Sequence, residues 1–164
     1  MTVLVAVASR HGATHEIAET IGRRLVEGGL EVDVQRVEDV RDPSQYDAVV
    51  LGSAVYVGRW LKSARAFVDA HAEELAARPT WLFSSGPIGD PPKPEGGDKA
   101  VQVEGVVAGT HARGHRVFAG RIDRSRLNLA ERAVASAVRA ADGDFRAWPE
   151  VEGWAGEIAA ALRG

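Results

Sequence analysis

Three short apolar runs, each followed by a longer segment with one apolar stripe, constrain the fold of this chain more than any other feature. The runs cover residues 3–8, 48–52 and 80–85, and each is ended by small or polar turn residues. Runs of this kind are typical of strands buried on both faces, as in a parallel sheet covered by helices on each side. The alternation of strand and helix therefore predicts an α/β fold.

Two further strands and several helices complete the predicted arrangement. Residues 30–37 alternate apolar and polar side chains, which indicates an edge strand with one wet face, and residues 116–120 form the predicted last strand. Helices are expected at residues 14–27, 61–78, 99–109, 126–141 and 154–162, with a turn region at 143–149. The third of these is interrupted by Gly105. Five strands in this order predict a parallel sheet with right-handed crossovers.

Length and composition exclude several classes of protein. The 164 residues are expected to form a single domain over residues 1–164. The absence of cysteine excludes disulfides and thiolate chemistry. The net charge is −3, and basic and acidic residues are interspersed, so the sequence shows no basic patch for nucleic acid. No apolar run approaches the ~20 residues of a membrane span, and no basic segment precedes the first strand. A cytoplasmic protein is expected.

The turn after the first strand, Ser9-Arg10-His11-Gly12-Ala13-Thr14, is a candidate phosphate site. A strand that turns directly into a helix presents backbone N–H groups and the positive end of the helix dipole to an anion. The spacing fits neither the dinucleotide motif nor the nucleoside-triphosphate motif, and the loop has no lysine, so a monophosphate ester is favoured. The alternative is an ordinary helix start capped by Ser9 or Thr14.

Two further loops follow strands of the same sheet, at residues 52–60 and 84–90. Because the carboxyl ends of parallel strands share one edge, the three loops are expected to converge on one ligand. Tyr56 offers an aromatic platform beside the phosphate loop, which suits a ligand with a phosphate tail and a flat ring. Alternatively, Tyr56 packs over the following helix. Trp60 is interpreted as structural and Trp81 as part of the core.

The histidines give no catalytic or metal-binding pattern. His15 and His71 are expected on solvated helix surfaces, and His111 and His115 flank a glycine and are interpreted as loop residues without a role. No pair has metal-ligand spacing beside a carboxylate, and no Ser/His/Asp set is visible.

The three loops resemble those of the flavodoxins. Residues 9–14 are similar to the flavodoxin phosphate loop Thr/Ser-x-Thr-Gly-x-Thr, and residues 52–58 and 84–87 are similar to the two ring-binding loops. Within the family, the flavodoxin-like protoporphyrinogen oxidases that use a quinone are the most similar subgroup. Residues 15–18, 119–123 and 143–148 also match its pattern, although His11 stands where that subgroup often has an acid.

The resemblance implies a flavodoxin-like three-layer fold with strand order 2-1-3-4-5 and an extra helix after the last strand. It implies FMN as the cofactor, with Tyr56 stacking on the flavin ring. The implied FMN-binding residues are Ser9, Arg10, His11, Gly12, Ala13 and Thr14 at the phosphate, Ser53, Ala54, Val55, Tyr56, Val57 and Gly58 along the ring, and Ser85, Gly86, Pro87, Ile88 and Gly89 at its polar edge.

The resemblance further implies an oxidoreductase that oxidises protoporphyrinogen IX and passes electrons to a quinone or another acceptor. The cations Arg59, Lys62 and Arg65 either attract the propionates of such a substrate or form an ordinary solvated helix face. An electron carrier serving a protein partner and a flavin-free binding or signalling module are the alternatives. The partners expected are thus a small redox substrate or a redox protein, with peripheral membrane contact left open and no nucleic acid.

Overall fold

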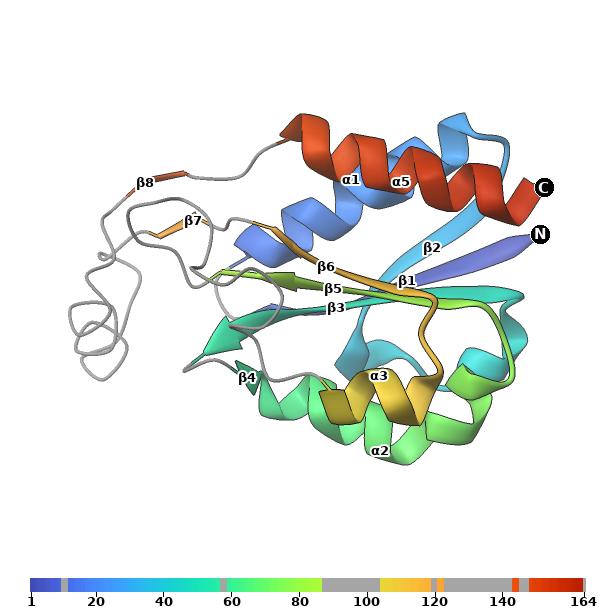
Figure 1. Ribbon diagram of the computed structural model, residues 1–164, viewed down its shortest axis with the longest axis vertical. Coiled ribbons are helices and arrows are strands. Elements are labelled where there is room, and N and C mark those ends of the chain that lie inside the picture. The colour runs from blue at the N-terminus through green and yellow to red at the C-terminus, as the bar shows by residue number, and fades with distance from the viewer. Residues whose placement is uncertain are drawn as a thin grey trace.

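A parallel β-sheet forms the middle layer of the molecule, with helices on both faces (Figure 1). This computed structural model describes residues 1–9, 12–56, 59–86, 104–118, 121–122, 143–144 and 148–163. The strands are β1 (Thr2–Ala8), β2 (Glu31–Arg36), β3 (Ala48–Tyr56), β4 (Arg59–Trp60), β5 (Thr80–Ser85), β6 (Gly114–Phe118), β7 (Arg121–Ile122) and β8 (Gly143–Asp144). The helices are α1 (Ala13–Glu27), α2 (Lys62–Ala76), α3 (Glu104–Thr110) and α5 (Trp148–Arg163), with 3₁₀ turns η1 (Val37–Asp39) and η2 (Pro43–Gln45).

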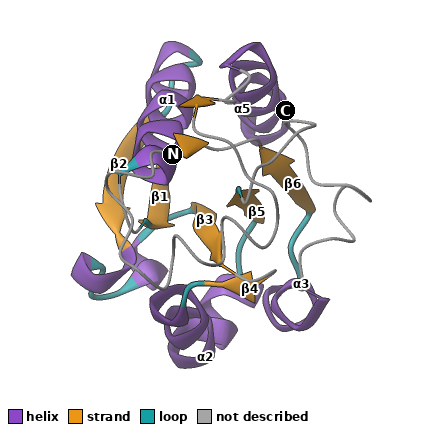
Figure 2. Ribbon diagram, turned by 90° about the vertical axis from the view of Figure 1, so that its left-hand side faces the viewer, coloured by secondary structure: helices purple, strands orange, loops and turns teal. Residues whose placement is uncertain are grey.

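The strand order confirms the predicted topology. The parallel strands run β2-β1-β3-β5-β6, which is the expected order 2-1-3-4-5 once the short β4 is set aside. β4 adds an antiparallel pair to the end of β3, and β7 pairs antiparallel with β8. α1 and α5 cover one face of the sheet and α2 and α3 cover the other (Figure 2).

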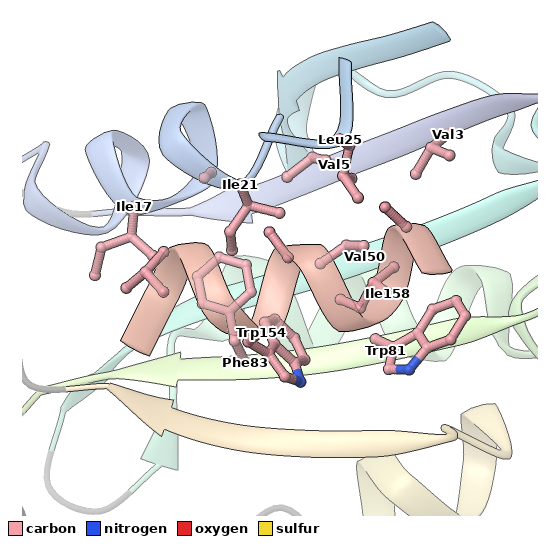
Figure 3. Packing of buried hydrophobic residues seen from close by; sticks show 14 of the residues in the cluster. Val3, Val5, Ile17, Ile21, Leu25, Val50, Trp81, Phe83, Trp154 and Ile158 are labelled. Atoms are coloured by element: carbon pink, nitrogen blue, oxygen red, sulfur yellow. The ribbon is translucent and has the colours of Figure 1, made fainter. Parts of the chain in front are cut away.

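Alternate residues of the central strands enter two separate cores. In β1, Val5 belongs to the core under α1 and α5, whereas its neighbour Leu4 belongs to the core under α2, and both side chains are fully buried. Figure 3 shows Ile17 of α1 and Trp154 of α5 packed over the same face as Val5. Burial on both faces explains why these strands lack the alternation of apolar and polar residues seen in the edge strand β2.

A cluster of rings fills the core under α1 and α5. Phe83 of β5 lies with its ring centroid 6.2 Å from that of Phe118 and 6.2 Å from that of Trp154, and all three side chains are buried. The Phe83 ring also lies over Gly52, its partner in β3: a Cβ at Gly52 would sit 2.0–2.4 Å from ring atoms. Gly52 is therefore required by the close approach of Phe83.

Several predicted boundaries are wrong. Residues 53–56 were expected in a loop but extend β3, because Val55 and Tyr56 find antiparallel partners in β4. The last strand begins at Gly114 instead of residue 116, and Gly105 lies inside α3 instead of interrupting it. The region 143–149 is not all turn, since it contains β8 and the start of α5, where proline at position 149 needs no helical N–H donor.

Some expectations fall outside the described residues. These are the helix expected at 126–141, the end of the predicted last strand at 119–120 and most of the loop at 86–97. Within the part of the chain that is described, no helix combines the length and the apolar character needed to cross a membrane.

Candidate functional site

The carboxyl ends of three parallel strands meet at one edge of the sheet. Ala8 of β1 is the partner of Ser53 in β3, and Ala54 is the partner of Ser85 in β5. Ser85 is in turn aligned with Phe118 at the end of β6. The ends of the three strands therefore lie at the same level, beside the first turns of α1 and α2 (Figure 1). In open parallel sheets, this edge is the usual place for a ligand.

The first loop leads into α1 through a left-handed glycine. Gly12 is the N-cap residue with φ 88°, and its N–H donates to Ser9 Oγ at 3.0 Å. Of the two caps predicted as the alternative, Thr14 is excluded because it lies inside the helix, whereas Ser9 accepts from the N–H of Gly12, the N-cap residue itself. Ser9 Oγ accepts from Gly12, which leaves its O–H able to donate to an anion. The start of α1 therefore directs the positive end of its helix dipole toward this edge of the sheet.

His15, in the first turn of α1, is less solvated than the sequence suggested. Its Nε2 lies 3.0 Å from Glu19 Oε1, and 29% of its side chain is exposed. Its Nδ1 is buried without a hydrogen-bond partner among the described residues. His71 of α2 contacts Phe67, with ring centroids 4.8 Å apart.

The second loop is a β-hairpin held down by a buried hydroxyl. Ser53 is fully buried, and its Oγ accepts from the Leu61 N–H at 3.0 Å and donates to the Ala54 carbonyl at 2.7 Å. Val55 is also buried, in the core under α2. The side chains of Ser53 and Val55 thus build the hairpin, and a ligand at this position would meet the backbone and the partly exposed Ala54.

The third loop begins with a left-handed glycine. Ser85 is 4% exposed, and Gly86 has φ 71°. The Gly86 N–H donates to the Phe118 carbonyl at 3.1 Å, so it extends the pairing of β5 with β6 and is not available to a ligand. The remaining predicted site residues lie outside the described residues: Arg10, His11, Val57, Gly58, Pro87, Ile88, Gly89 and the side chain of Tyr56.

A buried polar chain under the hairpin was missed by the sequence analysis. Trp60 is 2% exposed, which confirms its structural interpretation, and its Nε1–H donates to Ser84 Oγ at 2.7 Å. Ser84 Oγ also lies 2.7 Å from Nε2 of His115. The interpretation of His115 as a loop residue without a role is wrong, because it lies in β6 and faces β5. The sequence His115-Arg116-Val117-Phe118 carries no polar–apolar alternation, so no local signal marked His115 as a strand residue.

The cations near the hairpin are exposed. Arg59, Lys62 and Arg65 lie at the return of the hairpin and in the first turn of α2. Arg65 Nε donates to the Trp60 carbonyl at 3.2 Å, which ties the helix start to β4. These side chains place positive charge beside the carboxyl edge of the sheet, where an anionic ligand would be attracted.

Two groups with shifted pKa lie at the opposite edge, near the start of β3. Hydrogen bonds from Ser44 hold the pKa of the Asp42 carboxyl below its ordinary value. Burial, together with a hydrogen bond to Asp33, raises the pKa of the Tyr46 phenol. Their position makes them contributors to the pH dependence of stability, away from the candidate site.

Comparison with known proteins identifies sequences to which this chain is similar. A flavodoxin domain model matches residues 4–146. The protoporphyrinogen IX dehydrogenase (quinone) of Escherichia coli strain K12 is 33% identical over 86 residues, which cover 51% of this chain and 48% of that protein. The match thus spans about half the length of the curated relative.

Solved structures match over the whole chain. An archaeal flavodoxin aligns with a TM-score of 0.63 and 16% identity, covering 100% of both chains. The two-electron reduced flavodoxin of Megasphaera elsdenii aligns with a TM-score of 0.64 and 18% identity, covering 96% of this chain and 98% of that one. The rubredoxin oxygen:oxidoreductase of Desulfovibrio gigas aligns with a TM-score of 0.64 and 14% identity over 99% of this chain and 36% of that chain. At these identities the matches establish the fold.

Proposed function

The chain belongs to the flavodoxin family, and from this premise we propose that it binds FMN at the carboxyl edge of its sheet and acts as a flavin-dependent oxidoreductase. The observation that carries the proposal is the alignment of three strand ends, at Ala8, Ala54 and Ser85, beside the helix start at Gly12. A bound flavin accepts and donates electrons, and the protein supplies binding and tuning.

The helix start fits the phosphate of FMN. A Cβ added at Gly12 would have no atom of the described part of the chain within 4 Å. The N-terminus of α1 supplies N–H donors and the positive end of the helix dipole, and the Ser9 hydroxyl adds a donor. We expect the backbone N–H of Thr14 to contribute to the same anion, with Ala13 beside it.

The other two strand ends fit the flat ring. We propose that the hairpin from Ala54 to Tyr56 lines one face of the isoalloxazine, with Tyr56 stacking on it, and that the segment beginning at Ser85 borders its polar edge. Support comes from their shared level at the end of the sheet. Because Ser53 is saturated by Leu61 and Ala54, the contacts expected along the ring are mainly with the backbone.

Titration with FMN and with riboflavin tests the proposal. Binding is followed by quenching of flavin fluorescence, and riboflavin keeps the ring but lacks the phosphate. We expect FMN to bind with a Kd at least about tenfold below that of riboflavin, a difference of about 1.4 kcal/mol. Failure of the purified protein to take up FMN would refute the proposal. Equal Kd values would refute the role given to the helix start.

We propose oxidation of protoporphyrinogen IX as the reaction, with a quinone as electron acceptor. The sequence match to the Escherichia coli enzyme supports this substrate, and the exposed cations Arg59, Lys62 and Arg65 provide attraction for a substrate bearing carboxylates. In an anaerobic assay of the FMN-loaded protein, porphyrin fluorescence should rise only when a quinone is present. No quinone-dependent turnover would contradict this substrate.

Electron transfer to a protein partner is the second candidate function. The full-length structural match to flavodoxins favours it. A carrier would exchange electrons with a redox protein while leaving protoporphyrinogen unchanged in the same anaerobic assay. The two outcomes distinguish the carrier from the oxidase.

A further inference from the structure

Among the described residues, the partners of Trp60, Ser84 and His115 under the hairpin favour one arrangement of hydrogens. Ser84 is fully buried, and Trp60 Nε1, a donor only, occupies one acceptor position of its Oγ. Among the described residues, the other hydrogen-bond partner of Ser84 Oγ is His115 Nε2, 2.7 Å away. A buried hydroxyl hydrogen needs an acceptor, so His115 accepts it at Nε2 and carries its own ring hydrogen on Nδ1.

This arrangement links the outermost strand of the sheet to the hairpin. His115 lies in β6, Ser84 in β5 and Trp60 in β4, which pairs with the end of β3. Trp60 pairs with Val55, and the next pair along the hairpin joins Arg59 to Tyr56. The position of the hairpin over the sheet therefore depends on where Ser84 holds the indole.

A nucleophilic role for the Ser84–His115 pair does not fit this geometry. Ser84 has no exposed surface, and its hydroxyl is used by Trp60 on one side and by the imidazole on the other. No substrate atom can approach the oxygen without displacing the Trp60 side chain, which is itself 2% exposed. The pair is thus suited to hold a loop in place.

We propose that His115 is a positioning residue of the flavin site: by accepting the Ser84 hydroxyl, it fixes Trp60 and thereby the hairpin that carries Tyr56. This role rests on the proposed function, because the hairpin is assigned to one face of the flavin ring. His115 does not contact the ligand itself: it acts through Ser84 and Trp60 on the geometry of the ring site.

Three variants separate this role from a general contribution to stability. His115→Leu keeps the bulk and removes the acceptor. His115→Gln places a carbonyl oxygen where it can accept from Ser84. His111→Asn is the matched control, because it removes a nearby exposed histidine whose left-handed φ of 51° asparagine tolerates. Each variant is titrated with FMN at a temperature where urea melts show it fully folded.

The expected result is a rise in the FMN Kd of about tenfold for His115→Leu, since a buried hydroxyl loses its acceptor, with most of the affinity restored in His115→Gln. His111→Asn should leave the Kd unchanged. In NMR spectra, the His115 ring of the wild-type protein should show hydrogen on Nδ1, and the Trp60 indole resonance should shift in His115→Leu and return in His115→Gln.

Two results would overturn the role. A wild-type His115 ring with hydrogen on Nε2 would contradict the hydrogen arrangement, independently of any flavin. Equal FMN Kd values for the folded His115→Leu and His111→Asn proteins would refute positioning while leaving FMN binding in place. Failure of the wild-type protein to bind FMN would instead refute the proposed function, and this role with it.

Discussion

Gly12 and Gly29 form a matched pair at the two ends of α1. Gly12 has φ 88° and Gly29 has φ 91°, and at both positions an added Cβ would meet no atom of the described residues within 4 Å. Replacing either glycine with alanine therefore introduces the same backbone strain and no steric clash. The two positions differ in location, since Gly12 lies at the candidate phosphate site and Gly29 follows the opposite end of the helix.

The expected loss of stability is similar for Gly12→Ala and Gly29→Ala. Holding an L-residue in the left-handed region costs about 1–2 kcal/mol. The reduced entropy of the unfolded alanine chain offsets part of this, by about 0.4–1 kcal/mol. The net loss is thus about 1 kcal/mol, which lowers Tm by about 2–4 °C in a chain of this length.

The expected effect on FMN affinity differs between the two variants. Alanine at position 12 favours relaxation of φ away from 88°, which turns the N–H groups of the first helical turn away from the phosphate. We expect the FMN Kd to rise about tenfold in Gly12→Ala, or about 1.4 kcal/mol, and to stay unchanged in Gly29→Ala. Fluorescence titration gives the Kd values, and urea melts of the FMN-free proteins give the stabilities.

The comparison refutes the reasoning if the two variants lose equal stability and bind FMN with equal Kd. The first loop would then be a helix start without a role in binding. A much larger loss of stability in Gly12→Ala than in Gly29→Ala would contradict the strain estimate, because both positions have the same φ and the same open surroundings.

Three predictions concern the rest of the fold. Gly52→Ala should cost about 1–3 kcal/mol or more in urea melts, because the added Cβ would overlap the buried Phe83 ring. Hydrogen bonds from Ser44 lower the pKa of Asp42, so the carboxylate stabilises the fold at neutral pH and loses this effect as pH falls through the lowered pKa. In Asp42→Asn, Tm should therefore fall less steeply with decreasing pH below 3.8 than in the wild-type protein. Burial raises the pKa of Tyr46, so the neutral phenol stabilises the fold up to pH 10.0 and this stability is lost as pH rises through the raised pKa. In Tyr46→Phe, Tm should therefore fall less steeply with increasing pH above 10.0 than in the wild-type protein.

Each of these predictions has its own contradicting result. The clash at Gly52 should be relieved in a Phe83→Leu background, so equal costs of Gly52→Ala with and without that change would show that the ring is not responsible. If Tm depends on pH in the Asp42 and Tyr46 variants as it does in the wild-type protein, other groups dominate the pH dependence of stability.

The parallel sheet and the two-sided cores follow from patterns that a sequence displays locally, whereas the strand order 2-1-3-4-5 was implied by the resemblance to the flavodoxins. Apolar runs such as 3–8 and 48–52 are long enough for a strand and have no polar face, so they must lie in the interior of a covered sheet. Alignment of the described strand ends at one edge then follows from parallel strand direction alone. The left-handed start of α1 was not predicted, although Gly12 is the residue type that permits it.

The hairpin and the polar chain depend on pairing between distant residues. Small residues such as Gly52 and Ser53 suggested a loop, but Val55 gains a strand partner in Trp60, which no local propensity reveals. Ser84 and His115 are 31 positions apart and meet because β5 and β6 adopt one particular register. A shift of one residue in that register would turn His115 to the other face of the sheet.

Two buried serine hydroxyls at the ends of β3 and β5 hold the hairpin in place. Ser53 and Ser84 are register partners, and each uses its buried hydroxyl to anchor the hairpin return, at Leu61 and at Trp60 respectively. These two hydroxyls are thus committed to building the loop, while the described part of the edge offers a ligand backbone groups, the Ser9 hydroxyl and the start of α1. Such an arrangement suits a cofactor that brings its own chemistry, because the protein then needs rigid contacts more than it needs an acid or a base.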